Sequence, residues 1–106
     1  MSKVIAIARD HVALELALSG IQVHRVSDMK EAEDLLGEVL ESDADLLLLQ
    51  EEIRDGLSEF ARNNLMRHKG DPLVVYCPSF EDEHSDVDAY LSTIIKPAVG
   101  YEIRLD

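Results

Sequence analysis

Histidine, cysteine and carboxylate side chains are the groups in this chain that could bind a metal ion or attack a substrate. Cys77 is the single cysteine; it precedes Pro78, and no neighbouring residue could act as its base. Acidic residues gather in 81–88, but this segment lacks the alternating ligands and central glycine of an EF-hand loop. The four histidines have neither the i, i+4 spacing nor the nearby cysteine of a zinc site. We therefore predict no catalytic residues, no metal site and no cofactor.

The residues that follow the apolar runs are a second place to look, since parallel α/β sheets bind ligands at the carboxyl ends of their strands. Ala8-Arg9-Asp10-His11 contains no glycine, whereas a phosphate-binding loop needs glycines so that backbone amides can approach the phosphates. A phospho-receiver domain needs an aspartate at the end of its third strand, where this chain has Gln50. It also needs a pair of acidic residues after the first strand, where this chain has Asp10 without an acidic neighbour. Lys96-Pro97 is similar to the receiver lysine, but it falls at the end of a predicted helix. The sequence thus disfavours both nucleotide binding and phosphotransfer.

These side chains would be positioned by short apolar runs that alternate with segments of helical periodicity. The order predicts an α/β fold: a single, doubly wound, mostly parallel four-stranded sheet with helices on both faces, similar to receiver and Rossmann-like folds. We expect one domain over 1–106, with 98–106 as a C-terminal tail. The expected strands cover 4–8, 22–26, 45–49 and 73–76, and the expected helices cover 12–18, 28–41, 50–69 and 85–98.

Local signals refine these elements. Asp10 is expected to cap the first helix, and Asp28 with Glu31 forms a capping box for the second. Four consecutive leucines in 46–49 predict a central strand that is covered on both faces. Alternating polar and apolar residues in 22–26 predict a half-exposed edge strand. The third helix should bury one face, comprising Ile53, Leu57, Phe60, Ala61 and Leu65.

Composition excludes several classes of partner. The chain has 22 acidic and 10 basic residues, which gives a formal charge of −12. Nucleic-acid binding and attachment to anionic lipid both depend on Lys and Arg, so both are disfavoured. We expect neither a signal peptide nor a membrane-spanning segment, because no apolar run approaches the roughly 18–20 residues that a bilayer requires. A lone cysteine fits a reducing compartment. The charge is equally compatible with simple solubility and with docking onto a basic partner.

Several short segments, taken in order, are similar to one known family. They are Leu-Ala-Leu-Ser-Gly-Ile at 16–21, Glu-Ala-Glu-Asp-Leu-Leu at 31–36, the leucine run followed by Glu-Glu-Ile at 51–53, the strand that ends in Pro78-Ser79, and Ala-Val-Gly-Tyr-Glu-Ile-Arg-Leu at 98–105. In this combination the chain resembles the F subunit of V-type and archaeal-type ATP synthases. It departs from the family at Ala8-Arg9-Asp10, where a Gly-Asp pair is common, and at Pro97, which interrupts the last helix.

The resemblance implies a non-catalytic subunit of the rotating central stalk, which couples ATP synthesis or hydrolysis in the head to proton or sodium transport. It implies binding to the coiled-coil D component of the stalk and to the ATPase head subunits. No nucleic acid, small-molecule substrate or direct membrane insertion is expected. The protein would be cytoplasmic and peripheral to the membrane through the complex.

The candidate partner interface has two parts. His24 and Arg25 lie on the predicted edge strand, although an edge protected by charge has the same pattern. The second part is the C-terminal segment that the family is thought to use against the head, and its candidates are Val99, Tyr101, Ile103 and Arg104. The alternative function is a degenerate receiver-like adaptor that binds signalling proteins. Small-molecule sensing is a third hypothesis, which a deep pocket at the strand carboxyl ends would favour.

Overall fold

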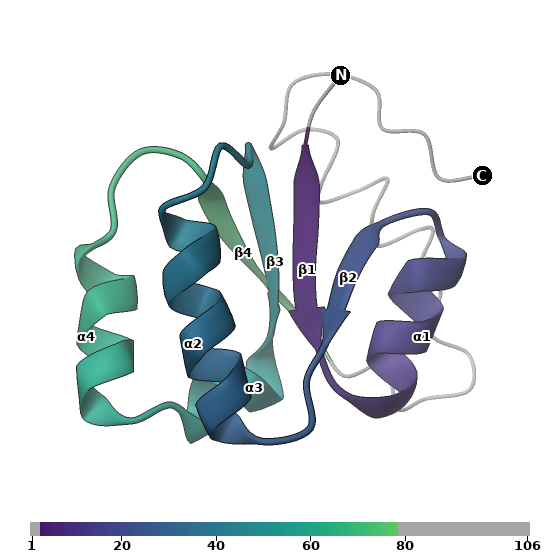
Figure 1. Ribbon diagram of the computed structural model, residues 1–106, viewed down its shortest axis with the longest axis horizontal. Coiled ribbons are helices and arrows are strands. Elements are labelled where there is room, and N and C mark those ends of the chain that lie inside the picture. The colour runs from purple at the N-terminus through teal and green to yellow at the C-terminus, as the bar shows by residue number, and fades with distance from the viewer. Residues whose placement is uncertain (1–2, 79–106) are drawn as a thin grey trace.

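The fold is a four-stranded parallel sheet between two layers of helices, seen in a computed structural model that describes residues 3–78 (Figure 1). The strand order is β2-β1-β3-β4, and all three strand pairs are parallel. The predicted α/β class and doubly wound arrangement are confirmed. In chain order the elements are β1 (Val4–Ala8), α1 (Asp10–Leu18), β2 (Gln22–Arg25), α2 (Met29–Leu40), β3 (Leu46–Gln50), α3 (Glu51–Gly56), α4 (Glu59–Arg67) and β4 (Leu73–Cys77).

The leucine run forms the central strand that its composition predicts. β3 lies between β1 and β4, and all five of its residues are buried. Leu47 and Leu49 belong to the core under α2, α3 and α4, whereas Leu46 and Leu48 belong to the core under α1. A strand with helices on both faces has no solvent side, so the polar alternation of an edge strand is absent.

The two helical layers are unequal within the described residues. Helix α1 covers one face of the sheet, and α2, α3 and α4 cover the other (Figure 1). Alternate residues of β1 supply both cores, because successive side chains of a strand point to opposite faces. The smaller core includes Ala6, Ala8, Val12, Ala13, Leu16 and Cys77, and the larger includes Ile5, Ile7, Ala32, Leu36, Val39 and Ile53.

The two predicted N-terminal caps have different outcomes. The backbone N–H of Glu31 donates to Asp28 Oδ1 at 2.8 Å, so the predicted cap of α2 is confirmed. The predicted cap of α1 is wrong. Asp10 is the first residue of that helix, and Arg9 occupies the cap position without a side-chain hydrogen bond. Asp10 has a φ of 49°, a left-handed conformation that aspartate tolerates better than most residues.

The helix expected over 50–69 is two helices, because the chain breaks between Gly56 and Glu59. Ser58 starts α4: its side chain accepts a hydrogen bond from the N–H of Ala61 at 3.2 Å. The break changes the phase of the helical stripe. Leu57 remains buried, but Phe60 is 76% exposed, so its expected place in the core is wrong.

The acidic loop, the last expected helix and the C-terminal tail lie outside the described residues. The same holds for Val99, Tyr101, Ile103 and Arg104. The extent of the domain and its tail therefore stays a prediction.

Candidate functional site

The carboxyl ends of β1 and β3 are tied together by Gln50. The backbone N–H of Arg9 donates to Gln50 Oε1 at 2.8 Å, although the two residues are 41 positions apart. Gln50 is only 3% exposed, and its Nε2 lies 3.4 Å from Glu52 Oε2. The chain leaves β1 towards β2 on one side and later returns to β3 on the other. This reversal of direction is the usual position of a ligand in such sheets.

Side chains of the chain pair with one another at this position. Arg9 Nη1 lies 3.4 Å from Glu52 Oε1, so a carboxylate that follows β3 is paired with a cation that follows β1. An amide at residue 50 has neither the charge nor the nucleophilicity of a phosphate-accepting aspartate. Within residues 3–78, no group of three or more His, Cys, Asp or Glu side chains could hold a metal ion. The arrangement supports strand-end packing and offers no acid–base pair for catalysis.

Cys77 ends β4 and is fully buried. Burial, and then the nearby carboxylates of Glu51 and Glu15, raise the pKa of the Cys77 thiol to about 12. A thiol with this pKa stays protonated at neutral pH and is a poor nucleophile. The interpretation of Cys77 as a structural residue is thereby supported.

His24 and Arg25 lie where the sequence predicts them, on a strand at the edge of the sheet. Within residues 3–78, β2 pairs only with β1, with His24 opposite Ile7 and Arg25 opposite Ala8. Arg25 is exposed and His24 is half-buried. The other four interface candidates are outside the described residues, so a meeting of the two parts stays a prediction.

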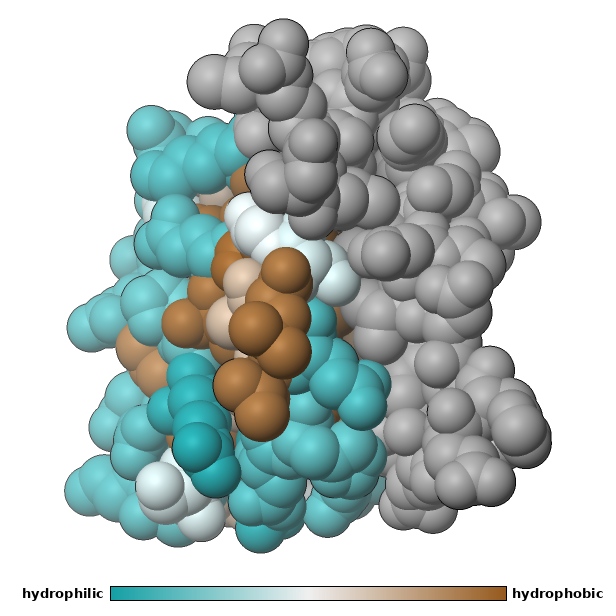
Figure 2. Space-filling view, turned by 90° about the vertical axis from the view of Figure 1, so that its right-hand side faces the viewer, coloured by the Kyte–Doolittle hydropathy of each residue, from teal (hydrophilic) through white to brown (hydrophobic). Residues whose placement is uncertain are grey.

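The outer side of α1 carries two leucines that sequence reasoning left without a role. Leu14 is 58% exposed and Leu18 is 77% exposed. They are separated by one helical turn and therefore lie on the same face. Figure 2 views the molecule from the α1 side and shows a hydrophobic patch with hydrophilic residues to its left and below it. A signal was visible in the sequence, because the segment 12–18 is apolar on nearly every side. Arg25 pairs with Ala8 of the core under α1, whereas His24 pairs with Ile7 of the core under α2, α3 and α4, so the two side chains point to opposite faces of the sheet. We name Leu14, Leu18 and Arg25 the α1–β2 face.

No helix within the described part of the chain has the length and apolar character needed to cross a bilayer.

Comparison with known proteins identifies the family. The family model described as the ATP synthase (F/14-kDa) subunit matches residues 4–94, which is most of the chain and includes every helix and strand given above. No curated protein matches the chain. The resemblance found in the short sequence segments is confirmed, and the chain belongs to the ATP synthase F/14-kDa subunit family.

Proposed function

We propose that this chain is a non-catalytic central-stalk subunit of a V-type or archaeal-type ATP synthase. In this role it rotates with the stalk and couples ATP synthesis or hydrolysis in the head to proton or sodium transport. The observation that carries the proposal is the family match over residues 4–94. The pairing of Arg9, Gln50 and Glu52 is consistent with it, because these side chains bind one another at the strand ends where related folds place their catalytic or ligand-binding groups.

The α1–β2 face is the surface that best suits the coiled-coil component of the stalk. A coiled coil buries its leucine seam between its own helices, so a docking subunit meets the positions beside the seam, which are often charged and carry long aliphatic stems. Leu14 and Leu18 offer apolar contact, and Arg25 offers an exposed cation that could pair with a carboxylate. Isolated surface leucines are common, but Leu14 and Leu18 lie one turn apart on the same face of α1, so a partner could contact both.

The remaining partners follow from the same role. Val99, Tyr101, Ile103 and Arg104 are proposed to contact the head subunits. The chain would then be held at the cytoplasmic side of the membrane through its neighbours in the complex.

Affinity purification of the tagged full chain from solubilised membranes tests this function, with mass spectrometry of the co-purified chains. We expect recovery of the coiled-coil stalk component together with the head subunits. Leu18→Glu places a charge on the α1–β2 face and should reduce that recovery at least tenfold. Met66→Glu is the matched control, since Met66 on α4 is 77% exposed, as Leu18 is, and lies on another helix.

One outcome would contradict the stalk role, and a second would contradict only the proposed interface. Recovery of signalling proteins alone, with the ATPase intact in the same extract, would favour the adaptor function. Equal recovery with Leu18→Glu and the wild type would keep the stalk role but remove the α1–β2 face from the interface.

A further inference from the structure

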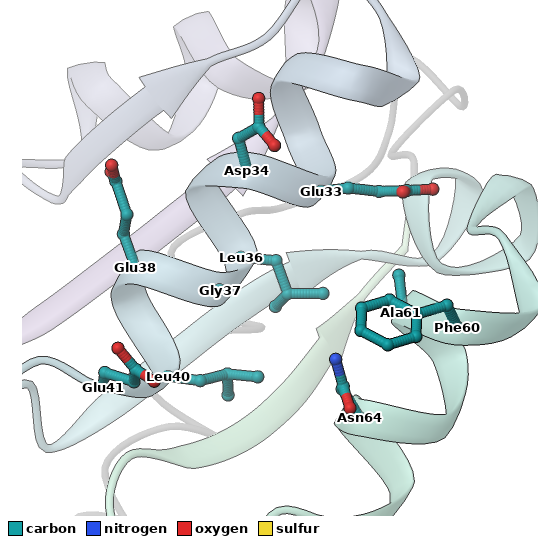
Figure 3. A pocket seen from close by; sticks show the side chains of 10 residues that line it. All are labelled: Glu33, Asp34, Leu36, Gly37, Glu38, Leu40, Glu41, Phe60, Ala61 and Asn64. Atoms are coloured by element: carbon teal, nitrogen blue, oxygen red, sulfur yellow. The ribbon is translucent and has the colours of Figure 1, made fainter.

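A groove runs between α2 and α4, on the opposite side of the sheet from α1. Its volume is about 520 Å³, within the range of pockets that hold several apolar groups. Figure 3 shows Leu36 and Leu40 extending from α2 towards α4, where Phe60 and Ala61 line the other wall. Phe60 is 76% exposed, so a large aromatic ring borders the groove without being covered. The apolar wall is therefore open to an incoming side chain.

Gly37 leaves bare backbone in the middle of this groove. It lies inside α2, where glycine is less favourable than alanine because it has more conformational freedom to lose. A Cβ atom at this position would meet nothing within 4 Å. Close packing by the described residues therefore does not explain the glycine. Gly37 lines the groove, so a partner seated there could approach the backbone of α2 more closely than any side chain at this position would allow.

The charge of the lining limits what that group can be. Besides its apolar residues, the groove is lined by four carboxylates of α2 and its end and by Asn64. Glu33 is already engaged, because the N–H and hydroxyl of Ser58 donate to its carboxylate at 2.8 and 3.2 Å. The other three carboxylates are those of Asp34, Glu38 and Glu41. Among the described residues that line the groove, none is basic. A second copy of this chain, with a charge of −12, would be repelled.

We propose that the α2–α4 groove binds an amphipathic helix of a partner protein that carries lysine or arginine beside its apolar stripe. The apolar side chains would pack on Leu36, Leu40 and Phe60. The long basic side chains would reach across α2 to Asp34 and Glu38, which Figure 3 shows pointing away from α4. The α2 residues of the lining span 33–40, a rise of about 10.5 Å, which suits two turns of a helix with anchors at i, i+3, i+4 and i+7.

This surface is distinct from the α1–β2 face, and the proposal stands on the groove rather than on the stalk assignment. The probe is an 18-residue helical peptide with leucines at i, i+3, i+4 and i+7 flanked by lysines. Its control has glutamates in place of the lysines. Each is titrated into the ¹⁵N-labelled full chain, and affinity and backbone shift changes are recorded. We expect the lysine peptide to bind, with shift changes concentrated in α2 and α4, and the glutamate peptide not to bind.

Gly37→Leu separates binding in the groove from general attraction to an acidic protein. The added side chain enters open space, so the circular dichroism spectrum should not change, while affinity for the lysine peptide should fall at least tenfold. Ala17→Leu adds the same side chain at an exposed position on α1 and should bind as the wild type does. As a second variant, Asp34→Asn combined with Glu38→Gln should weaken binding and reduce its salt dependence.

Three results would overturn the proposal. Gly37→Leu could bind the lysine peptide as tightly as the wild type, or the shift changes could spread over the whole acidic surface. Alternatively, the wild type could sediment as a dimer that Gly37→Leu dissociates, which would make a second copy the occupant. The stalk function is tested by the affinity purification, and Leu18→Glu, which tests the α1–β2 face, should leave peptide binding unchanged, so the two proposals fail separately.

Discussion

At the scale of single residues, Gln50 shows why this sheet departs from the receiver pattern. A carboxylate at a position only 3% exposed would have to be desolvated beside Glu52, at a high cost in free energy. The oxygen of the neutral amide instead accepts a hydrogen bond from the backbone N–H of Arg9, and this bond joins the ends of β1 and β3. The absence of an aspartate could be read from the sequence. The bond to Arg9 could not, because it joins residues that only the folded sheet brings together.

Cys77 provides a test at the same scale. Because its folded pKa of about 12 is above the ordinary value of 9.0, the folded state keeps the thiol proton at pH values where the unfolded chain loses it. The resulting stability is fully present below pH 9 and is lost as pH rises from 9 towards 12. In this window the free energy of unfolding should fall by up to about 1.4 kcal/mol per pH unit.

The measurement is urea denaturation of the wild type and Cys77→Ala between about pH 8 and about pH 10.5. This range begins below the ordinary pKa of the thiol and extends into the window where the effect is expected. Lys and Tyr titrate in both proteins, so the difference between them isolates the thiol. We expect the stability advantage of the wild type to shrink as pH rises. A constant difference across the range would show that the thiol titrates normally in the folded state.

At the scale of elements, the junction between α3 and α4 depends on a contact with α2. Ser58 caps α4 through its bond to the Ala61 N–H, and it also donates two hydrogen bonds to Glu33. Removing the hydroxyl in Ser58→Ala should lower the free energy of unfolding by about 1 kcal/mol, as for other helix caps. Glu33→Ala should cost less, because the carboxylate is partly solvated.

A double-mutant cycle measured by chemical denaturation checks this contact. Since the two side chains touch, the double variant should lose less stability than the sum of the single variants, by about 0.5 kcal/mol or more. Ser27→Ala, at an exposed serine just before α2, should change stability by less than about 0.5 kcal/mol. Strict additivity would mean that the hydrogen bond between the Ser58 hydroxyl and Glu33 contributes no stability, since the backbone N–H of residue 58 can still donate to Glu33 in Ser58→Ala.

The elements also show where sequence patterns are sufficient. The leucine run, the β-branched strand 73–76 and the Asp28 cap rest on neighbouring residues, and the sequence predicts each of them. The break at Ser58 escapes prediction because the apolar spacing continues through it, and one of the contacts that hold it comes from Glu33 on another helix. The same spacing places Phe60 in the core. Sequence periodicity reports local geometry and cannot detect a change of phase that tertiary contacts impose.

The candidate interface also has one part that local sequence predicts and one part that depends on tertiary structure. The edge position of His24 and Arg25 is predictable, since alternation along a strand indicates one solvated side. The exposure of Leu14 and Leu18 is not, because a helix that is apolar on nearly every side does not show which side faces the sheet. The α2–α4 groove is likewise invisible in the sequence, since its walls come from helices that are separate along the chain.

At the scale of the whole molecule, the dominant feature is the excess of negative charge. A formal charge of −12 on 106 residues destabilises the compact state through self-repulsion. Of the ion pairs within residues 3–78, Arg9–Glu52 links two strand ends, and Arg54–Asp55 joins neighbours in sequence. Such exposed pairs contribute little stability, so they offset only a small part of the repulsion.

Salt should therefore stabilise this protein rather than weaken it. The Debye length falls from about 30 Å at 0.01 M salt to about 10 Å at 0.1 M, which screens repulsion between helices on one face of the sheet. We expect the melting temperature, measured by differential scanning calorimetry at neutral pH, to rise by several degrees between these concentrations. The combined variant Asp34→Asn and Glu38→Gln has two fewer negative charges on α2, so its melting temperature should rise less. A fall in melting temperature with added salt would instead mean that favourable ion pairs outweigh the repulsion, and α2 would then have to be stabilised by its carboxylates.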